Sequence, residues 1–323
     1  MKANVTEDGL SCYKAVQGIA CTASLNGEYF FYPVTAVNIV LAITAWLENA
    51  VILVALQRKN SLHPTSKLMF QCLAVTDLCV GVFAQPLFVI QFASATHRQF
   101  QLCFIVLSIN DVVGSCLSGV SLLTLAAISV DRLLALSLGI KYKKTINLKR
   151  TRLVMISIWI FNISVNSLRR FWRYVLISRV TSAVIYSSLV ISAFSYLKIY
   201  SKLRRHKKNM RENDLQGRQT NEEFLNRPMN IERYRKTVST ALCVQVTMVA
   251  CYLPYGIVVA MERHSPSFNI AVRLAISLVF LNSSLNPILY CWKIRGVKLA
   301  VKNIIRQLCK SCLIWKSGQD LSG

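Results

Sequence analysis

The residues of this chain that are best suited to chemistry are polar and ionisable side chains inside apolar stretches. Asp77 lies in the middle of one stretch, in CLAVTDLCVG, and Asp131 and Arg132 lie at the end of another, in ISVDRLLAL. Glu48 and Asn49 form a further pair. Such residues are costly in lipid and usually functional, the alternative being that each only joins neighbouring helices. A lone carboxylate such as that of Asp77 needs a cation or several hydrogen-bond donors beside it.

Further polar residues are expected at a depth in the membrane comparable to that of Asp77. They are Asn49, Ser121, Asn282, Ser283 and Asn286. Oxygen atoms of carboxylates and amides are the ligands that small hard cations prefer. The sequence therefore predicts a hydrated polar cluster around Asp77 that holds a small cation.

The elements that must position these residues are membrane-spanning helices. Of the 323 residues, 54% are hydrophobic and 16% charged, a mix too apolar for a soluble protein of this length. Several apolar stretches approach or exceed the roughly 20 residues that a helix needs to cross a bilayer. They are Tyr32–Leu56, Leu68–Phe92, Leu102–Leu136, Leu153–Phe171, Val175–Tyr200, Thr237–Met261 and Phe268–Trp292. We therefore expect an all-α membrane protein, with a seven-transmembrane helix bundle over residues 32–292, an N-terminal segment 1–31 and a C-terminal part 293–323.

The distribution of basic residues predicts how the bundle is oriented. The net charge is +24, but the basic residues lie between apolar stretches, which indicates a membrane protein and not a nucleic-acid-binding protein. They gather in the first, third and fifth connections and in the C-terminal tail, which are therefore expected in the cytoplasm, with the N-terminus outside. Arg169, Arg170 and Arg173 in the fourth connection are the exception. They either snorkel to lipid head groups or form a positive rim at a ligand entrance.

Prolines interrupt several of the predicted spans. Pro86, Pro254 and Pro287 each remove a backbone hydrogen bond and kink a helix. Neighbouring helices and water can satisfy the freed carbonyl groups, so tolerated kinks are one explanation. Because the kinks lie beside polar residues, we favour a moving part.

The two ends of the chain carry candidate modification sites. Residues Lys293–Leu308 show apolar side chains at helical spacing with basic ones largely opposite, the pattern of a short amphipathic helix on an anionic membrane surface. Cys309 and Cys312 follow, placed for palmitoylation, or are free cytosolic thiols. Near the N-terminus, Asn4 begins the glycosylation acceptor triplet Asn-Val-Thr.

Six features appear in a characteristic order along the chain. They are Asn49, LAVTDL around Asp77, DRLLAL from Asp131, Trp159, CYLP with Pro254, and NPILY from Asn286 to Tyr290. This ordered set resembles the rhodopsin-like (class A) G-protein-coupled receptors over about Tyr32 to Cys312. In that family the span-two aspartate anchors a sodium ion that favours the inactive state. The resemblance assigns this ion to Asp77, Ser121, Asn282 and Asn286, and it implies no organic cofactor.

The resemblance also implies how the chain signals. Asp131 holds Arg132 at rest, and Arg132 meets the G protein when the sixth span moves outward about Pro254, after which Tyr196 and Tyr290 steady the open state. The residues of this switch are Asp131, Arg132, Tyr196, Tyr252, Pro254, Asn286, Pro287 and Tyr290. Ligand and G protein both favour the open state. We therefore expect a plasma-membrane receptor that binds an extracellular ligand and activates heterotrimeric G proteins, with arrestin, a receptor kinase and membrane lipids as further partners.

Several residues depart from the family pattern. They are Leu133 after Asp-Arg, Tyr252 for the span-six tryptophan, Ser188 for the span-five proline, and Tyr234 for the span-six acid that pairs with Arg132. The external disulfide also differs, since Leu107 stands at its span-three position and the short fourth connection has no cysteine. Cys103 lies one turn earlier, and we expect it to pair with Cys12 or Cys21. The disulfide, the short connection and Ser188 together resemble the melanocortin–adenosine–cannabinoid–lysophospholipid branch.

The sequence predicts where a ligand binds but does not name it. The expected pocket residues are Asp111, Gly114, Ser118, Tyr252, Tyr255 and Arg273. Amine receptors use an aspartate at the position of Gly114, so a simple biogenic amine is not expected, although Asp111 suits a basic ligand from the rim. Val259 replaces the asparagine that holds adenine in adenosine receptors. Arginines at the outer rim, such as Arg98 and Arg273, suggest an acidic or phosphate-bearing ligand.

Other classes of function fit parts of the pattern. A transporter or channel would line a path with polar residues, but no inverted repeat or pair of broken helices is visible. A receptor-like protein that binds ligand without signalling would not need Asp131, Arg132 and NPILY. Enzymatic chemistry is not expected, because the sequence shows no nucleophile–base pairing and no metal motif such as His-Glu-x-x-His.

Overall fold

The computed structural model describes most of the helical part of the chain. The described residues are 21, 28–58, 63–168, 174–215, 243–261, 266–293, 298–299, 301–304 and 306–307. Within these ranges the structure is helical and contains no strand. Seven helices are long and apolar enough to cross a membrane: Tyr32–Arg58, Pro64–Thr96, Phe100–Leu138, Leu148–Leu168, Arg179–Lys202, Cys243–Met261 and Ile270–Leu289. Each overlaps one predicted span, so the predicted fold class is confirmed.

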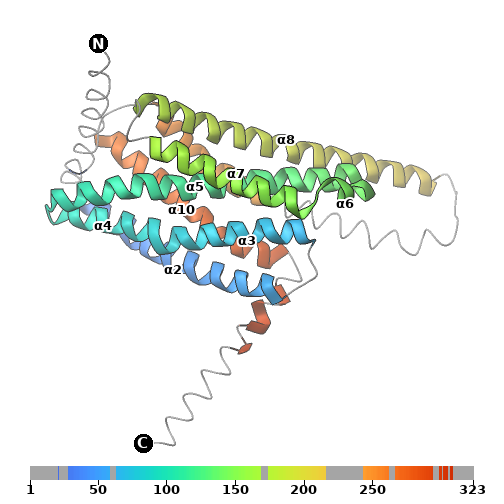
Figure 1. Ribbon diagram of the computed structural model, residues 1–323, viewed down its shortest axis with the longest axis horizontal. Helices are drawn as coiled ribbons and strands as arrows, with labels where there is room; N and C mark the ends of the chain where they lie inside the picture. The colour runs from blue at the N-terminus through green and yellow to red at the C-terminus, as the bar shows by residue number, and fades with distance from the viewer. Residues whose placement is uncertain are drawn as a thin grey trace, which may run out of the picture.

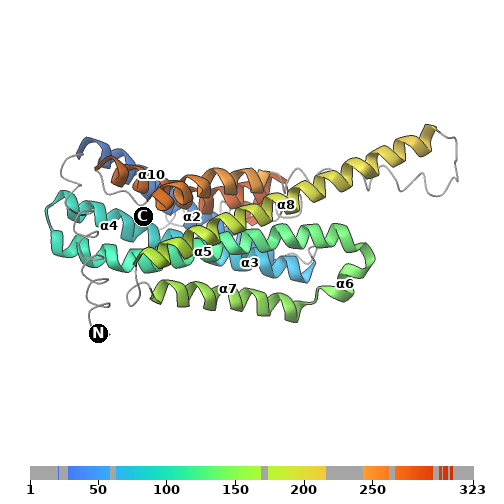
Figure 2. The same ribbon diagram turned by 90° about the horizontal axis from the view of Figure 1, so that it is seen from above.

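The spanning helices lie side by side in one bundle (Figures 1 and 2). The labelled helices are α2 (Glu28–Arg58), α3 (Pro64–Cys79), α4 (Gln85–Thr96), α5 (Phe100–Leu138), α7 (Leu148–Leu168), α8 (Tyr174–Leu215) and α10 (Pro266–Lys293). Helix α5 packs against α3, α4, α7 and α8, so its residues can contact most of the other spans. The short helix α6 (Tyr142–Thr145) lies at one end of the bundle, and the end of α4 lies at the other. We call these the Asp131 end and the Cys103 end.

The bundle is apolar on its outside and polar at many positions inside. Large hydrophobic side chains such as Val190, Leu153 and Ile160 are more than 60% exposed, which suits a surface in contact with hydrocarbon. Several amides and carboxylates are instead buried, Asp77 and Gln85 among them. In the membrane a buried polar group must find its partners within the protein. The candidate functional residues therefore lie in the interior of the bundle.

The second span is the least regular of the described helices. Between α3 and α4 lies a π-helical turn, η2 (Val80–Ala84), in which Gln85 N–H donates to the carbonyl of Val80, five residues earlier. This turn directly precedes Pro86, which has no N–H to donate. Such turns are rare and often lie at functional sites. Here the turn follows Asp77 by one helical turn and re-aims α4.

A glycine lets the second span approach α2 closely. A Cβ atom on Gly81 would lie 2.9 Å from the carbonyl oxygen of Ala42 and 2.9 Å from the backbone nitrogen of Trp46. Neither backbone atom can move away without bending α2, so only glycine fits here. The close approach places Asp77 one turn from the tightest contact between the two spans.

Helix α8 is longer than the sequence predicts for its span. It continues to Leu215, beyond the predicted end at Tyr200, and projects past the rest of the bundle (Figure 1). The polar fifth connection therefore begins with a helical extension of α8. Ser188, at the family's proline position, keeps the helix regular and donates its hydroxyl to the carbonyl of Val184 at 2.7 Å.

Parts of the predicted C-terminal amphipathic helix are also described. Ile304 is buried and packs with Val301 against Ala55 of α2, while Lys298 and Lys302 are exposed. The apolar and basic faces therefore lie as predicted in the described part. Other predicted features lie outside the described residues: Asn4, Cys12, Arg169, Arg170, Arg173, Tyr234, Cys309, Cys312 and the side chain of Tyr290.

Candidate functional site

The carboxylate of Asp77 is the centre of a buried polar cluster that joins three helices. Ser121 of α5 and Ser283 of α10 donate to its Oδ1 at 3.0 and 2.9 Å, and Asn286 of α10 donates to Oδ2 at 2.8 Å. The Asp77 side chain is completely buried. The structure thus brings together three of the four residues expected to hold the ion, Asp77, Ser121 and Asn286, and Ser283, expected in the polar cluster, is a direct partner of Asp77.

The fourth expected residue, Asn282, lies on the same helix as Asn286, and the hydrogen-bonding groups of its side chain are not used within the described part of the chain. Asn282 lies one turn before Asn286 on α10 and is 1% exposed. Among the described residues, neither amide atom of Asn282 has a hydrogen-bond partner, and nor has Oδ1 of Asn286. Buried polar groups normally have partners, and so these amide oxygens have lone pairs that a cation or a water molecule could use. The donor set of a carboxylate, amides and hydroxyls therefore fits a small hard cation.

The hinge at Pro287 is tied to the same cluster. Proline has no N–H, which leaves the carbonyl of Ser283, four residues earlier, without its helical donor. Asn49 of α2 fills this role, because its Nδ2 donates to the Ser283 carbonyl at 3.0 Å and to that of Ala45 at 2.8 Å. The hydroxyl of Ser283 meanwhile bonds to Asp77. One residue thus links the hinge of α10 to the carboxylate, a link that the presence of Asn49 suggested but did not specify.

Near the C-terminal end of α5, Asp131 is held by three side chains. Arg132 lies 3.3 Å from its Oδ2, Tyr142 donates to Oδ1 at 2.6 Å, and Ser66 donates to Oδ2 at 3.3 Å. Arg132 also lies over the ring of Phe70, 5.8 Å from its centroid. Asp131 is buried, whereas about a quarter of the Arg132 side chain is exposed. The acid–arginine pair expected from the sequence is therefore present, with the acid anchored inside and the arginine at the surface.

Tyr142 was not anticipated as part of this site. It is the first residue of α6, and its oxygen accepts a further hydrogen bond from the hydroxyl of Thr65 at 3.2 Å. The ring of His63 packs on it, with 5.3 Å between the ring centroids. Burial raises the pKa of Tyr142 above its ordinary value, and the hydrogen bond to Asp131 raises it further. The phenol is therefore protonated at neutral pH and serves as a donor. A tyrosine in a basic connection carries no sequence signal for this role.

A cavity of about 180 Å³ opens between the spans on the Cys103 side of Asp77. All the expected pocket residues line it: Asp111, Gly114, Ser118, Tyr252, Tyr255 and Arg273. The sequence did not single out its amide side chains, which come from α4, α5 and α7. These are Gln91, Asn110, Asn162 and Asn166. The remaining lining is mostly apolar, so the cavity has the composition of a small-molecule site.

Tyr252 lines the cavity and is bonded to α5 close to the Asp77 cluster. It stands where the family has tryptophan, is 3% exposed, and donates its hydroxyl to the backbone carbonyl of Ser118 at 3.1 Å. Ser118 lies one turn before Ser121, the residue of α5 that bonds to Asp77. The ring of Tyr252 therefore contacts the cavity on one side and the apolar core on the other.

Comparison with known proteins identifies the group of proteins that share this arrangement. The sequence profile of the family described as "7 transmembrane receptor (rhodopsin family)" matches residues 48–175 and 164–290. The chain belongs to this family of receptors. Members of the family are receptors and not enzymes, and the chain is accordingly a multi-pass membrane receptor.

Individual relatives of the receptor match over different lengths and at lower identity than 30%. The 5-hydroxytryptamine receptor 1E of Homo sapiens is 29% identical over 136 residues, which are 42% of this chain and 36% of that protein. The chain therefore matches only about a third of the length of this relative. The 5-hydroxytryptamine receptor 1B of Equus caballus is 23% identical over 336 residues, covering 84% of this chain and 85% of that protein. The crystal structure of squid rhodopsin shares the fold, with a TM-score of 0.71 at 15% identity over 87% of each chain.

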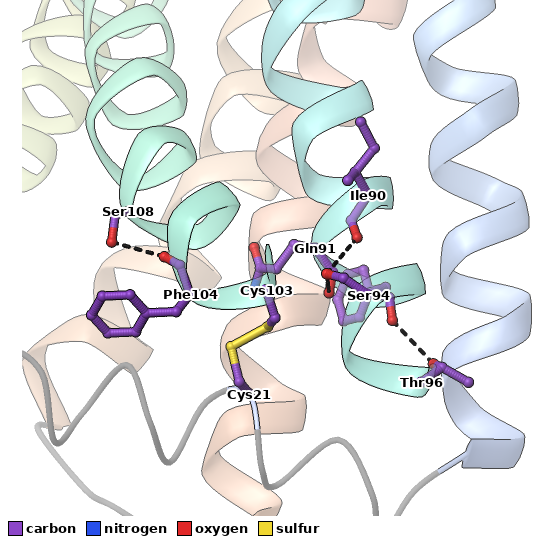
Figure 3. The surroundings of a disulfide bond; sticks show 9 residues. Cys21, Ile90, Gln91, Ser94, Thr96, Cys103, Phe104 and Ser108 are labelled. Atoms are coloured by element: carbon purple, nitrogen blue, oxygen red, sulfur yellow. Dashed lines mark hydrogen bonds between the residues drawn. A yellow bond between two sulfur atoms is a disulfide. The ribbon is translucent and has the colours of Figure 1, made fainter. Parts of the chain in front are cut away.

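A disulfide joins the N-terminal part of the receptor to the edge of the cavity. Cys21 bonds to Cys103 at the start of α5, close to the end of α4 (Figure 3). Of the two partners that the sequence left open for Cys103, the structure has Cys21. Both cysteines are buried against Ala95 and Leu107, and Leu107 also lines the cavity. The bond therefore braces the wall of the cavity.

The other predicted switch residues lie on the helices that flank Arg132. Tyr196 of α8 is partly buried and stacks on Tyr200, with 6.4 Å between ring centroids. Pro254 lies within the helix Cys243–Met261, whose Met248 is packed against Ser192 of α8. This contact joins the helix Cys243–Met261 to α8.

Proposed function

We propose that the receptor binds an extracellular ligand in the cavity and activates heterotrimeric G proteins from the Asp131 end. The observation that carries this proposal is the position of Tyr252, which lines the cavity and bonds to Ser118, one turn from the Asp77 cluster. A ligand that displaces this ring acts on the helix that contains Pro254. The chain of contacts therefore gives a route from the cavity to the moving span.

The orientation that this proposal needs agrees with the charge distribution. Exposed basic side chains gather at the Asp131 end, on the connection through α6, the extension of α8 and the C-terminal helix. They include Lys141, Lys144, Arg150, Arg204, Arg205, Lys208, Lys298 and Lys302. Basic connections stay in the cytoplasm. We therefore place the Asp131 end in the cytoplasm and the Cys103 end outside the plasma membrane.

Activation is proposed to be a shift between two arrangements of the bundle. At rest, Asp131 holds Arg132 together with Tyr142 and Ser66. When the helix Cys243–Met261 swings outward about Pro254, Arg132 turns away from Asp131 and meets the G protein. Ligand and G protein each stabilise this second state, and so each raises the affinity for the other.

The Asp77 cluster is proposed to hold a sodium ion in the resting state. Asp77, Ser121, Asn282 and Asn286 would be its protein ligands, and the ion would supply the positive charge that the buried carboxylate lacks among its described partners. With the cluster closed around Asp77, α3, α5 and α10 are held together. Opening it frees α10 at Pro287.

Further partners follow from family membership and from surface charge. Arrestin and a receptor kinase are expected at the Asp131 end, and anionic lipids at the C-terminal amphipathic helix, with Cys309 and Cys312 as palmitoylation sites. Ser188, the short fourth connection and the unusual disulfide support the melanocortin–adenosine–cannabinoid–lysophospholipid branch. The matched relatives described above are serotonin receptors, so the branch stays a prediction.

The direct test is G-protein activation in cells that express the receptor. We expect Arg132→Ala to abolish both basal and ligand-driven activation while leaving surface expression intact. Arg179→Ala is the matched control, because Arg179 is exposed on α8 at the opposite end. Activation by Arg132→Ala equal to that of the wild type would contradict the proposal and favour a receptor-like protein that does not signal. An ion current through the wild-type protein would favour a channel.

A further inference from the structure

We propose that the cavity is built for a small ligand that carries a carboxylate, and that Arg273 is the residue that binds this group. The inference deepens the proposed function, since it takes the cavity as the ligand site. It assigns a negative charge to the ligand, whereas membership of the family alone does not determine the charge of the ligand. It also separates this receptor from its 5-hydroxytryptamine-receptor relatives, because 5-hydroxytryptamine is an amine.

Arg273 is inside the cavity and not at its rim. The sequence placed it among the arginines of an outer rim, but its side chain is 6% exposed and lines the cavity wall. Its guanidinium lies over the ring of Phe92, 4.7 Å from the centroid. Stacking uses one face of the guanidinium, and its buried Nη1 group, whose hydrogen-bonding capacity is not used within the described part of the chain, can donate to an oxyanion. A fixed, desolvated guanidinium is well suited to recognise a carboxylate.

The amide side chains around Arg273 fit the same kind of ligand. Gln91 precedes Phe92 on α4 and is 5% exposed, and Asn110 of α5 is 8% exposed. Both line the cavity, and Oδ1 of Asn110 has no hydrogen-bond partner among the described residues. An amide can donate through nitrogen to a carboxylate and accept through oxygen from the rest of a ligand. The cavity therefore offers neutral polar groups beside its guanidinium.

Amine receptors carry an aspartate at the position of Gly114, and here the side chain of Asn110 lies in the space beside this glycine. A Cβ atom on Gly114 would lie 3.0 Å from Oδ1 of Asn110, so the Asn110 side chain occupies the space beside this glycine. Asp111 is the carboxylate that remains on the described wall, nearly one turn outward. A ligand amine would consequently depend on Asp111, and an acid on Arg273. This difference gives the two possibilities separate genetic tests.

The size of the cavity favours a small acid over a whole lipid. Its volume of about 180 Å³ is below the roughly 300 Å³ at which pockets for drug-sized ligands begin. Aromatic and aliphatic side chains, among them Phe88, Phe280 and Ile276, form most of the wall. The expected ligand is therefore a carboxylate on a compact apolar or aromatic body.

The experiment compares probes that differ only in charge. The full-length receptor, purified in nanodiscs, is heated with matched sets of small molecules: 3-phenylpropionate, phenethylamine and 3-phenylpropionamide, then indole-3-propionate, tryptamine and indole-3-propionamide. We expect the acids to raise Tm and the amines and amides not to. The affinity for the acids should fall about thirtyfold or more in Arg273→Gln, because a buried charge pair is broken. Arg179→Gln, outside the cavity, should bind them as the wild type does.

Two further variants keep the test decisive if Arg273→Gln does not fold. Phe92→Leu keeps the guanidinium and removes its stacking partner, and should weaken the acids without making the amines bind. Arg273→Lys should retain part of the binding, because it keeps the charge and loses the fork. No stabilisation by any short acid would overturn the proposal. Stabilisation by the amines that is lost in Asp111→Asn, or acid binding that survives Arg273→Gln, would also overturn it.

Two further measurements distinguish a small acid from a fatty acid as the ligand, and ligand binding from signalling. Stabilisation by oleate but by neither short acid would contradict the small-ligand part of the proposal. The Arg132→Ala variant should bind the acids like the wild type, since Arg132 lies at the opposite end of α5. Failure of acid binding is therefore distinguishable from failure of G-protein activation.

Discussion

At the scale of single residues, the receptor depends on a few buried carboxylates whose partners differ in kind. Asp77 has hydroxyl and amide donors, and Asp131 has a tyrosine, a serine and the neighbouring arginine. Hydrogen bonds to the charged form are what stabilise a carboxylate away from water. Donors alone leave the charge of Asp77 uncompensated, which is why an ion is expected there and not at Asp131.

Replacing Asp77 by asparagine tests the ion directly. Wild-type receptor should be more heat-stable in sodium chloride than in choline chloride, because a ligand that binds only the folded state raises Tm. In Asp77→Asn the difference should vanish, since the amide has no charge to attract the ion. The Asp111→Asn variant, which removes the cavity carboxylate, should keep the sodium response. A sodium response in Asp77→Asn equal to that of the wild type would show that the cluster is not the ion site.

At the scale of elements, the decisive contacts are those between spans, and they differ in how far the sequence revealed them. Asp77, Asn282 and Asn286 could be placed together because polar residues in lipid must find each other. Tyr142 could not, since it belongs to the short helix α6 outside the predicted spans, where a polar side chain in the sequence is not unusual. The π turn at Val80–Ala84 also escaped prediction, because its residues, VGVFA, are apolar or small throughout and leave no pattern in which a shift of phase could be seen. The sequence places Arg273 at the outer rim of the bundle, because its contact with Phe92 joins segments that are far apart in the chain and cannot be seen in the sequence.

The contact between α6 and α5 is expected to restrain signalling. Tyr142→Phe removes the 2.6 Å hydrogen bond to Asp131 and its link to Thr65, which ties α6 to α3. Because Asp131 then holds Arg132 less firmly, basal G-protein activation should rise severalfold, corresponding to about 1 kcal/mol. Tyr200→Phe is the control, since Tyr200 is an exposed tyrosine on α8. Basal activation in Tyr142→Phe at or below the wild-type level would contradict this role.

The contact between α2 and the second span is expected to tolerate no side chain at Gly81. A methyl group there would meet backbone atoms of Ala42 and Trp46 at 2.9 Å, and such overpacking costs roughly 1–3 kcal/mol. We expect Gly81→Ala to lower Tm and to weaken the sodium response, since Asp77 lies one turn away. Gly256→Ala is a milder control, because its methyl would meet the Ile185 side chain at 3.2 Å. Equal Tm values for the two variants would show that the backbone of α2 moves away from residue 81 at little energetic cost.

At the scale of the whole molecule, the two ends of the bundle carry opposite tasks. The Cys103 end contains the cavity with Asp111 and Arg273 in its wall and the disulfide, and the Asp131 end contains Arg132 and the basic surface. Between them lie Tyr252 and the Asp77 cluster, both of which touch α5. The bundle itself was predictable from hydropathy, because seven long apolar helices leave few ways to satisfy the backbone in lipid. The choice of Cys21 for Cys103 was not, since sequence spacing does not determine pairing.

The disulfide is expected to stabilise the receptor by closing the N-terminal segment onto the bundle. It links residues 82 positions apart, so its loss frees a long loop in the unfolded state and unpins the cavity wall near Leu107. Cys21→Ser and Cys103→Ser should each lower Tm by the same amount, and the double variant should lower it no further, because both remove one bond. A reducing agent should lower the Tm of the wild type to that of the variants and leave Cys12→Ser as sensitive as the wild type. If Cys12→Ser were instead destabilised and insensitive to reduction, Cys103 would pair with Cys12 in the membrane.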